Sequence, residues 1–198
     1  MASLHDLIDN SLTDKNTTHS YLYLYDYLLD PKRTTATNVL EIGIGVFNEK
    51  NGGSIKLWYR FFENATIYAI DIIDDTRVLD ELKNNPRIVL YTSTDAYLES
   101  TVKKISDVKF DMILDDGPHT LESMKDCIRL YSSLLKDDGI LIIEDVQSPE
   151  WIDELKKVVP EHLKQHIKSY DLRHNKWHNK GRYDDIVFTL DKRIVSPV

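Results

Sequence analysis

The sequence predicts an α/β domain organised around a mostly parallel β-sheet. Short apolar runs rich in branched side chains alternate with longer stretches of helical periodicity, which is the pattern of consecutive β–α–β units. The chain has 198 residues, of which 41% are hydrophobic, and this suits one hydrophobic core rather than two. We therefore expect a single domain over residues 1–198, with an N-terminal helical cap region at 1–36 and a Rossmann-like core at 37–198.

Seven apolar runs are predicted as strands. They lie at residues 38–42, 66–70, 87–91, 110–114, 140–143, 167–170 and 185–190. A short turn region around residues 175–181 separates the last two runs, which predicts a hairpin and therefore an antiparallel edge strand. We expect a central seven-stranded, mostly parallel sheet with an antiparallel C-terminal strand and helices on both faces.

Five amphipathic stretches are predicted as helices, at residues 18–29, 54–62, 76–82, 121–135 and 149–159. Asp30-Pro31 ends the first of them. This first helix carries tyrosines at the alternating positions 21, 23, 25 and 27, which cannot all share one helix face. Tyr21 and Tyr25 are four residues apart and do share a face, so we expect one pair to line something specific and the other to meet solvent or core.

Composition limits the compartment and the partners. The formal net charge of −8 argues against a whole-surface grip on nucleic acid or anionic lipid and favours a neutral or cationic small ligand. Cys127 is the only cysteine, which excludes an internal disulfide and a cysteine-based zinc cluster and indicates a reducing compartment. The sequence shows neither the roughly 18-residue apolar run of a membrane helix nor a secretory leader, so we expect a soluble, cytoplasmic protein.

A glycine-containing turn follows the first predicted strand, with Gly43 and Gly45 separated by one residue. Glycines here let the backbone pass close to a ligand at the carboxyl end of the strand. Asn48 stands where the dinucleotide fingerprint needs a third glycine, which weakens an NAD assignment. Glu41, the acidic residue before the glycines, is instead typical of class I methyltransferases that bind S-adenosylmethionine. A plain tight turn remains the alternative.

The ends of the next two strands carry further candidate cofactor ligands. Asp71 directly follows the second strand, where a carboxylate can accept both ribose hydroxyls of a nucleoside. After the third strand, Thr94 and Asp95 are candidates to reach the adenine. The structural alternative is the same for all three residues, because short polar side chains after a strand also cap helices and turns.

Acidic residues gather after the fourth and fifth strands, as Asp115-Asp116 and Glu144-Asp145. Neighbouring parallel strands deliver them to one sheet edge, where several carboxylates repel one another unless a cation is present. A hard divalent ion such as Mg²⁺ resolves that repulsion, whereas helix caps and solvated acids are the alternative. His119 lies three residues beyond Asp116 and is the natural general base of such a site.

These residues resemble the metal-dependent sugar O-methyltransferases of macrolide antibiotic biosynthesis, of the mycinamicin and macrocin type. The resemblance spans most of the chain and rests on several motifs in order. They are Thr13-Asp14-Lys15, His19-x-Tyr21 with Tyr25, the run 39–45, Gly52-Gly53-Ser54 leading to Trp58, Ile67–Asp71, Asp115–His119, Gly139–Asp145, Asp171-Leu172-Arg173 and Arg182–Asp185. The sequence departs from the family pattern at Pro118, where serine is common, and at Ser93-Thr94-Asp95, where a Gly-Asp-Gln type sequence is usual.

Carried over by position, the resemblance implies Asp116, Glu144 and Asp145 as magnesium ligands and His119 as the catalytic base. It also implies Glu41, Gly43, Gly45 and Asp71 around the S-adenosylmethionine. We add Asp115 and Tyr21, with Thr94 and Asp95, to the expected cofactor-binding set, and Asp116 to the catalytic set beside His119.

The sequence therefore predicts an S-adenosylmethionine- and Mg²⁺-dependent O-methyltransferase of a sugar hydroxyl on a glycan, a nucleotide sugar or a glycosylated small molecule. Metal chelation by neighbouring hydroxyls would lower the pKa of the acceptor while His119 removes its proton. The alternatives are a catechol-type or nucleic-acid methyltransferase, an NAD-dependent oxidoreductase, and a non-catalytic nucleoside-binding protein. We expect a small-molecule or carbohydrate acceptor, no membrane or nucleic-acid partner, and a homo-oligomer.

One segment is basic, although the chain as a whole is acidic. Residues 156–182 hold eight lysines and arginines against Glu161 and Asp171, with four histidines and Trp177 interspersed. The simple interpretation is a solvated face with a hairpin loop. The functional interpretations are a site for a phosphate-bearing acceptor and an RNA-binding face. His174 and His178 are four residues apart, but Asn175 and Gly181 favour a loop over a zinc-binding helix.

Overall fold

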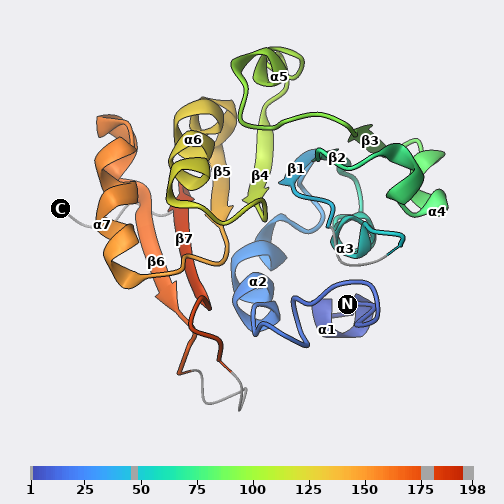
Figure 1. Cartoon of the computed structure of the whole chain (residues 1–198), viewed down its shortest axis with the longest axis horizontal. Helices are drawn as coiled ribbons and strands as arrows, with labels where there is room; N and C mark the ends of the chain where they lie inside the picture. The colour runs from blue at the N-terminus through green and yellow to red at the C-terminus, as the bar shows by residue number, and fades with distance from the viewer. Residues whose placement is uncertain (1, 46–48, 175–180, 194–198) are drawn as a thin grey trace.

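The computed structural model describes residues 2–45, 49–174 and 181–193. Its centre is a seven-stranded sheet with the order β3-β2-β1-β4-β5-β7-β6 (Figure 1). The strands are β1 Asn38–Ile42, β2 Thr66–Ile70, β3 Ile88–Tyr91, β4 Phe110–Asp115, β5 Leu135–Ile143, β6 Ile167–Asp171 and β7 Ile186–Asp191. Strands β1 to β5 pair in parallel, and β7 is antiparallel to both β5 and β6. The predicted seven-stranded, mostly parallel sheet is confirmed.

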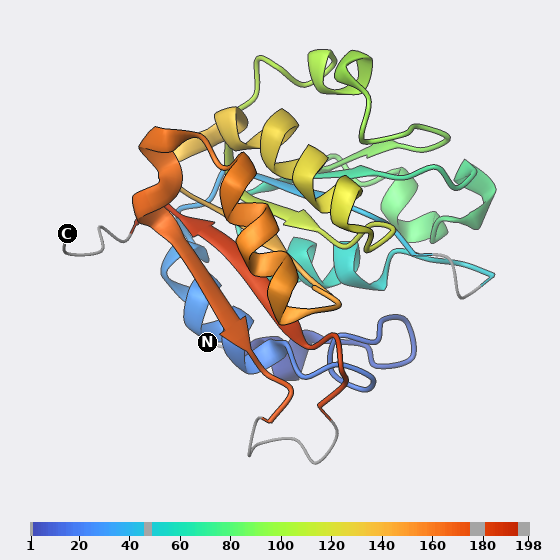
Figure 2. The same cartoon turned by 60° about the vertical axis from the view of Figure 1, so that its left-hand side comes forward.

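Helices cover both faces of the sheet, as predicted. The α-helices are α1 Leu4–Leu7, α2 Leu22–Leu29, α3 Gly53–Phe61, α4 Asp80–Lys83, α5 Glu99–Lys103, α6 Leu121–Tyr131 and α7 Pro149–Val158. The 3₁₀ turns are η1 Asp30–Lys32, η2 Asp75–Arg77, η3 Ser132–Leu134 and η4 Glu161–His166. Figure 2 shows α6 and α7 on one side of the sheet and α2 and α3 on the other.

Two hydrophobic clusters sandwich the sheet, because successive side chains of a strand point to opposite faces. Val39 of β1 packs into the cluster with α2 and α3, and its neighbour Leu40 packs into the cluster with α6 and α7. Both side chains are fully buried. The central parallel strands are thus apolar on both faces, which leaves their carboxyl-terminal ends as the place for polar groups.

Several element boundaries differ from the sequence prediction. The first long helix begins at Leu22 rather than residue 18, because the backbone N–H groups of Thr17, Thr18 and His19 all bond to the carbonyl of Asp14 and form a turn. The predicted helix at 76–82 is split into η2 and α4. The cause is Val78, which lies between them and forms a β-bridge with Asn51.

The C-terminal half holds two more differences, at the end of α6 and at the start of β5. The helix predicted at 121–135 ends as α6 at Tyr131 and continues only as the 3₁₀ turn η3, and β5 begins at Leu135, five residues earlier than predicted. The predicted antiparallel edge strand is confirmed: β6 forms the edge and pairs antiparallel with β7, which lies between β5 and β6. Most of the predicted hairpin turn at 175–181 falls outside the described residues. Among the described residues, no helix has both the length and the apolar character needed to cross a membrane.

Candidate active site

A cleft of about 960 Å³ opens at the carboxyl ends of β1, β2 and β4. Ligands of open α/β sheets bind at this edge, where the strand order reverses beside the first strand. The N-terminal segment 10–19 forms one wall, and the turns that follow the strands form the others. Eight of the predicted site residues line the cleft, namely Gly43, Gly45, Asp71, Thr94, Asp95, Asp116, His119 and Asp145. The other four, Tyr21, Glu41, Asp115 and Glu144, are buried outside its lining.

The turn after β1 needs its first glycine for two reasons. Gly43 has a φ of +98°, which L side chains rarely adopt. A Cβ atom on Gly43 would also lie 2.1 Å from the backbone oxygen of Asp116. The backbone after β1 therefore packs directly against the backbone after β4, so the predicted cofactor side and the predicted metal side of the cleft share one wall.

Asp71 fixes this turn to the end of β2. One carboxylate oxygen accepts hydrogen bonds from the backbone N–H groups of Ile44 at 2.5 Å and Gly45 at 3.3 Å. The other oxygen accepts from the N–H of Ile73 at 3.0 Å. Asp71 therefore does cap this turn. Its side chain also lines the cleft, and its ribose-binding role stays a prediction.

Thr94 and Asp95 line the same side of the cleft beyond β3. The Thr94 hydroxyl donates to the carbonyl of Thr92, and the Asp95 carboxylate accepts from the N–H of Tyr97. These bonds shape the loop, and the expected adenine contacts remain untested. Tyr97 is a cleft residue that the sequence did not single out, and its hydroxyl donates to the buried carboxylate of Asp115 at 2.6 Å.

Glu41 lies beneath the cleft. Its side chain is fully buried and accepts a hydrogen bond from Trp58 Nε1 at 2.8 Å. Burial raises the pKa of Glu41 to about 8, although Lys15 and the hydrogen bonds of Ser54 and Trp58 act to lower it. Its second oxygen, Oε1, has no hydrogen-bond partner. The expected place of Glu41 around the cofactor stays a prediction.

The predicted acidic cluster does assemble at the ends of β4 and β5. The backbone N–H of Asp116 donates to Ile42 and that of Glu144 donates to Asp115, which aligns the ends of β1, β4 and β5. His119 and Asp145 have φ values of +52° and +53°. Such values are uncommon outside glycine and concentrate at functional sites, where the surrounding structure enforces them.

Three of these side chains meet at the cleft wall. His119 Nε2 lies 3.3 Å from an oxygen of Asp145 and 3.7 Å from an oxygen of Asp116. One ligand atom from each of the three residues falls within 4.8 Å of the others. Burial would raise the pKa of Asp116, but Lys15 and His119 outweigh it and hold that pKa below its ordinary value. This carboxylate is therefore ionised at neutral pH.

Glu144 is turned away from the cleft. Its carboxylate is 1% exposed and accepts a hydrogen bond from Lys15 Nζ at 2.5 Å on one oxygen. The hydroxyl of Tyr25 donates to the other oxygen. Burial, together with the charges of Asp116 and Asp145, raises the pKa of Glu144 well above its usual value despite the opposing effect of Lys15.

The tyrosines of α2 separate into two pairs, as predicted. Tyr21 and Tyr25 are buried and donate to Asp145 and Glu144, respectively. Tyr23 and Tyr27 are 50% and 68% exposed. Tyr21 therefore holds a predicted metal ligand in this structure, and its expected contact with the cofactor is untested.

His19 and Asp185 form a second buried pair beside the cluster. His19 Nδ1 lies 2.7 Å from an oxygen of Asp185 and 3.3 Å from an oxygen of Asp145. Asp185 is fully buried and also accepts from the backbone N–H of Arg182. His19 lines the cleft. Both residues occur in the motifs that carry the family resemblance, but no spacing along the chain indicates that they meet.

A divalent cation fits the outer part of this cluster. Asp116 and Asp145 present carboxylate oxygens to the cleft, beside His119 and at least partly accessible, with side-chain exposures of 26% and 10%. Oxygen ligands with open positions toward a cleft are what Mg²⁺ requires. Glu144, the third predicted ligand, has both oxygens engaged by hydrogen bonds, so its ligand role stays a prediction.

Within its described residues, several cations of the basic segment are paired with acids close to them in sequence. Lys156, Lys157 and Lys164 each pair with an acid three residues earlier, and Arg173 pairs with Asp171. The exposed, self-paired side chains fit the solvated-face interpretation. Trp177, His178 and the predicted loop around them lie outside the described residues.

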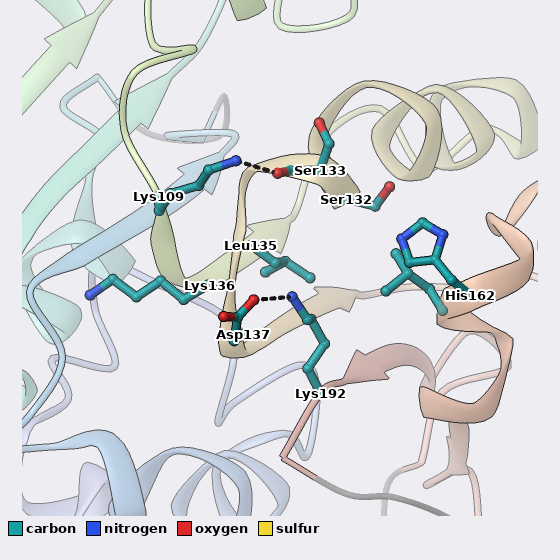
Figure 3. Close-up of a pocket in the computed structure, with 9 residues that line it drawn as sticks. Lys109, Ser132, Ser133, Leu135, Lys136, Asp137, His162 and Lys192 are labelled. Atoms are coloured by element: carbon teal, nitrogen blue, oxygen red, sulfur yellow. Dashed lines mark hydrogen bonds and ion pairs between the residues drawn. The ribbon is translucent and has the colours of Figure 1, made fainter.

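A second hollow of about 630 Å³ lies at the opposite edge of the sheet, near the starts of β4 and β5. It contains none of the predicted site residues. Figure 3 shows Lys109 reaching the carbonyl of Ser133 and Lys192 reaching Asp137. Lys109 and Lys192 are therefore already paired within this hollow.

The fold is that of class I methyltransferases. The structure of MycE methyltransferase from the mycinamycin biosynthetic pathway, in complex with Mg, S-adenosylhomocysteine and mycinamycin VI, superposes with a TM-score of 0.67 at 21% identity, over 88% of this chain and 49% of that one. An O-methyltransferase from Bacillus cereus in complex with S-adenosylhomocysteine superposes with a TM-score of 0.57 at 13% identity, over 83% and 77% of the two chains.

Curated relatives show which methyltransferases the chain is similar to in sequence. The chain is 30% identical over 136 residues to mycinamicin VI 2''-O-methyltransferase of Micromonospora griseorubida, covering 67% of this chain and 33% of that protein. It is 29% identical over 144 residues to 8-demethyl-8-alpha-L-rhamnosyl tetracenomycin-C 2'-O-methyltransferase of Streptomyces olivaceus, covering 70% and 36%. No protein-family model matches. The predicted resemblance to macrolide sugar O-methyltransferases is confirmed, and the chain spans about a third of the length of these relatives.

Proposed function

We propose that the protein is an S-adenosylmethionine-dependent and divalent-cation-dependent O-methyltransferase that acts on a sugar hydroxyl. One observation carries the proposal: the cleft joins the glycine turn of β1 and Asp71 on one side to Asp116, His119 and Asp145 on the other. The residues proposed to bind the nucleoside and the charged, histidine-containing cluster thus line one continuous space. The similarity to sugar O-methyltransferases supports the same assignment.

The methyl donor would lie along the glycine turn. Gly43 and Gly45 leave room for it beside the backbone. In this proposal Asp71 binds the ribose and Thr94 and Asp95 contact the adenine, which their position in the cleft lining supports. The cationic sulfonium suits this end of the cleft, where carboxylates outnumber cations. The donor needs no cradle for a pyrophosphate, which agrees with the absence of a third glycine at Asn48.

In this proposal His119 acts as the general base. A bound divalent ion, held by Asp116 and Asp145 with Glu144 as the further candidate ligand, would lower the pKa of an acceptor hydroxyl. His119 then accepts the hydroxyl proton at Nε2. The acceptor oxygen forms its bond to the methyl carbon while the carbon–sulfur bond breaks and its electron pair stays on sulfur. The cleft contributes by holding oxygen, carbon and sulfur in line.

Calorimetric titration tests the first half of the proposal. We expect the protein to bind S-adenosylmethionine and S-adenosylhomocysteine and not NAD, each measured with Mg²⁺ and with a chelator. Binding of NAD alone, or of none of the three, would reduce the similarity to a shared fold. The chemistry is then tested by transfer of a labelled methyl group to glycosylated small molecules, because the relatives are named for acceptors of this class.

A further inference from the structure

A lysine side chain lies inside the carboxylate cluster, beneath the cleft. Lys15 Nζ is 2.6 Å from Asp116 Oδ2, 2.5 Å from Glu144 Oε2 and 3.8 Å from Glu41 Oε1. Its side chain is 1% exposed. Lysine is almost never fully buried without a partner, and here one ammonium serves three carboxylates.

The lysine reaches this place from a segment remote in sequence. Lys15 belongs to the turn 14–19 that precedes α2, and its carbonyl accepts the backbone N–H of Tyr21. Glu144 is 129 residues further along the chain. The Lys15 side chain thus connects the N-terminal segment, which forms one wall of the cleft, to the ends of β4 and β5.

Lys15 is the cation that faces these carboxylates from within the cluster. The side chains of Glu41, Asp116 and Glu144 all come within 4 Å of its ammonium. Glu41 Oε1 is buried and has no hydrogen-bond partner, and Lys15 Nζ lies 3.8 Å from it. Removing one partner of a buried ionic group leaves an uncompensated charge and is strongly destabilising, so a cation is needed at this inner position.

We infer that Lys15 is the built-in cation of the cluster: its ammonium fills the inner position between Asp116 and Glu144 and thereby weakens divalent-ion binding at the outer position, between Asp116 and Asp145. The outer position rests on the proposed function, whereas the inner one rests on the contacts of Lys15. Asp116 belongs to both positions, since one oxygen faces Lys15 and the other faces His119. Lys15 is a positioning residue that does not line the cleft.

Mn²⁺ binding to the full chain tests the inference. Lys15→Met removes the charge and keeps most of the volume, so we expect Mn²⁺ to bind about tenfold or more tightly than in the wild type, because a positive charge a few ångströms away repels the ion. The free Mn²⁺ is measured by electron paramagnetic resonance. We also expect a lower melting temperature without metal and a larger rise on adding Mn²⁺. A purely structural lysine would not tighten metal binding.

Lys32→Met is the matched control. Lys32 is also buried and pairs with two aspartates, Asp111 and Asp138, at the opposite edge of the sheet. The same substitution there should lower the melting temperature and leave Mn²⁺ affinity unchanged.

The outcomes separate this inference from the proposed function. Equal or weaker Mn²⁺ binding in Lys15→Met than in the wild type overturns the role of Lys15 and leaves the methyltransferase proposal standing. Binding in the variant alone supports the role of Lys15 and removes the metal from the proposal. No binding in either protein overturns the role of Lys15 and removes the metal from the proposal. If Lys15→Met does not fold, the double variant Lys15→Met, Glu144→Gln decides: restored folding supports the charge balance, and continued unfolding contradicts it.

Discussion

The imidazoles of His19 and His119 lie against opposite oxygens of one carboxylate, that of Asp145. His19 Nδ1 is 3.3 Å from Oδ1 and His119 Nε2 is 3.3 Å from Oδ2. The two histidines differ in what else they contact. His19 is held by the buried Asp185 at 2.7 Å and stacks on Tyr21, whereas His119 is 29% exposed in the cleft wall. The histidine with fewer structural contacts is therefore the better candidate base.

Replacing His119 by alanine should lower methyl transfer by about 10²-fold or more, because the acceptor hydroxyl loses its proton acceptor. Binding of S-adenosylhomocysteine should stay within about twofold of the wild type, since the cofactor end of the cleft is unchanged. Single-turnover transfer and calorimetry measure the two effects. Unchanged turnover would remove His119 from the base role and move attention to His19.

Asp145→Asn should weaken divalent-cation binding by about tenfold or more, because it removes one of the two carboxylates that face the cleft. Transfer should fall in parallel and should also be lost from the wild type on chelation, while S-adenosylhomocysteine still binds. Asp153→Asn, at an exposed position in α7, is the control and should change neither. A variant still stimulated by Mg²⁺ as strongly as the wild type would contradict the ligand assignment.

The sheet and the meeting of the acidic residues could be predicted because both follow from local pattern. Apolar runs mark the parallel strands, and residues directly after them share one edge. Asp116 and Asp145 were found in this way. The inward orientation of the Glu144 side chain could not be predicted. It depends on hydrogen bonds from Lys15 and Tyr25, which are more than a hundred residues away in the sequence.

The position of the Lys15 side chain inside the carboxylate cluster could not be predicted from the sequence. The turn that places it is built from backbone hydrogen bonds to Asp14 and has no hydrophobic period to detect. In the sequence, Lys15 stands out only as part of Thr13-Asp14-Lys15, one of the motifs that carry the family resemblance. The absence of a lysine from the Asp115–His119 loop likewise gave no hint that one reaches Asp116 from elsewhere.

Gly43→Ala should destabilise the protein by about 1–3 kcal/mol, the usual range for a residue forced into a strained backbone conformation. The added Cβ would also approach the carbonyl of Asp116 within 2.1 Å, so S-adenosylhomocysteine binding should weaken as the turns after β1 and β4 separate. Urea denaturation and calorimetry measure both. Wild-type stability together with wild-type binding would show that the two backbones need not be in contact.

Asp111, at the start of β4, should make stability depend on pH at a place remote from the cleft. Its carboxylate accepts from the backbone N–H groups of Thr37 and Asn38 and from Lys136 Nζ. Burial acts to raise the pKa of Asp111, but these hydrogen bonds and the charge of Lys136 outweigh it and hold the pKa below its ordinary value. The folded state therefore binds this proton more weakly than the unfolded chain does.

A pKa depressed on folding stabilises the protein at pH values above the unfolded pKa of about 3.9. That stabilisation is lost as the pH falls through the lower, folded pKa. Asp111→Asn should therefore lower the free energy of unfolding by about 1–3 kcal/mol at pH 7, as loss of a charged acceptor does. Its difference from the wild type should shrink as the pH falls below about 4. Urea denaturation across pH 3 to 8 measures this, and a difference that stays constant with pH would show that the carboxylate charge does not contribute.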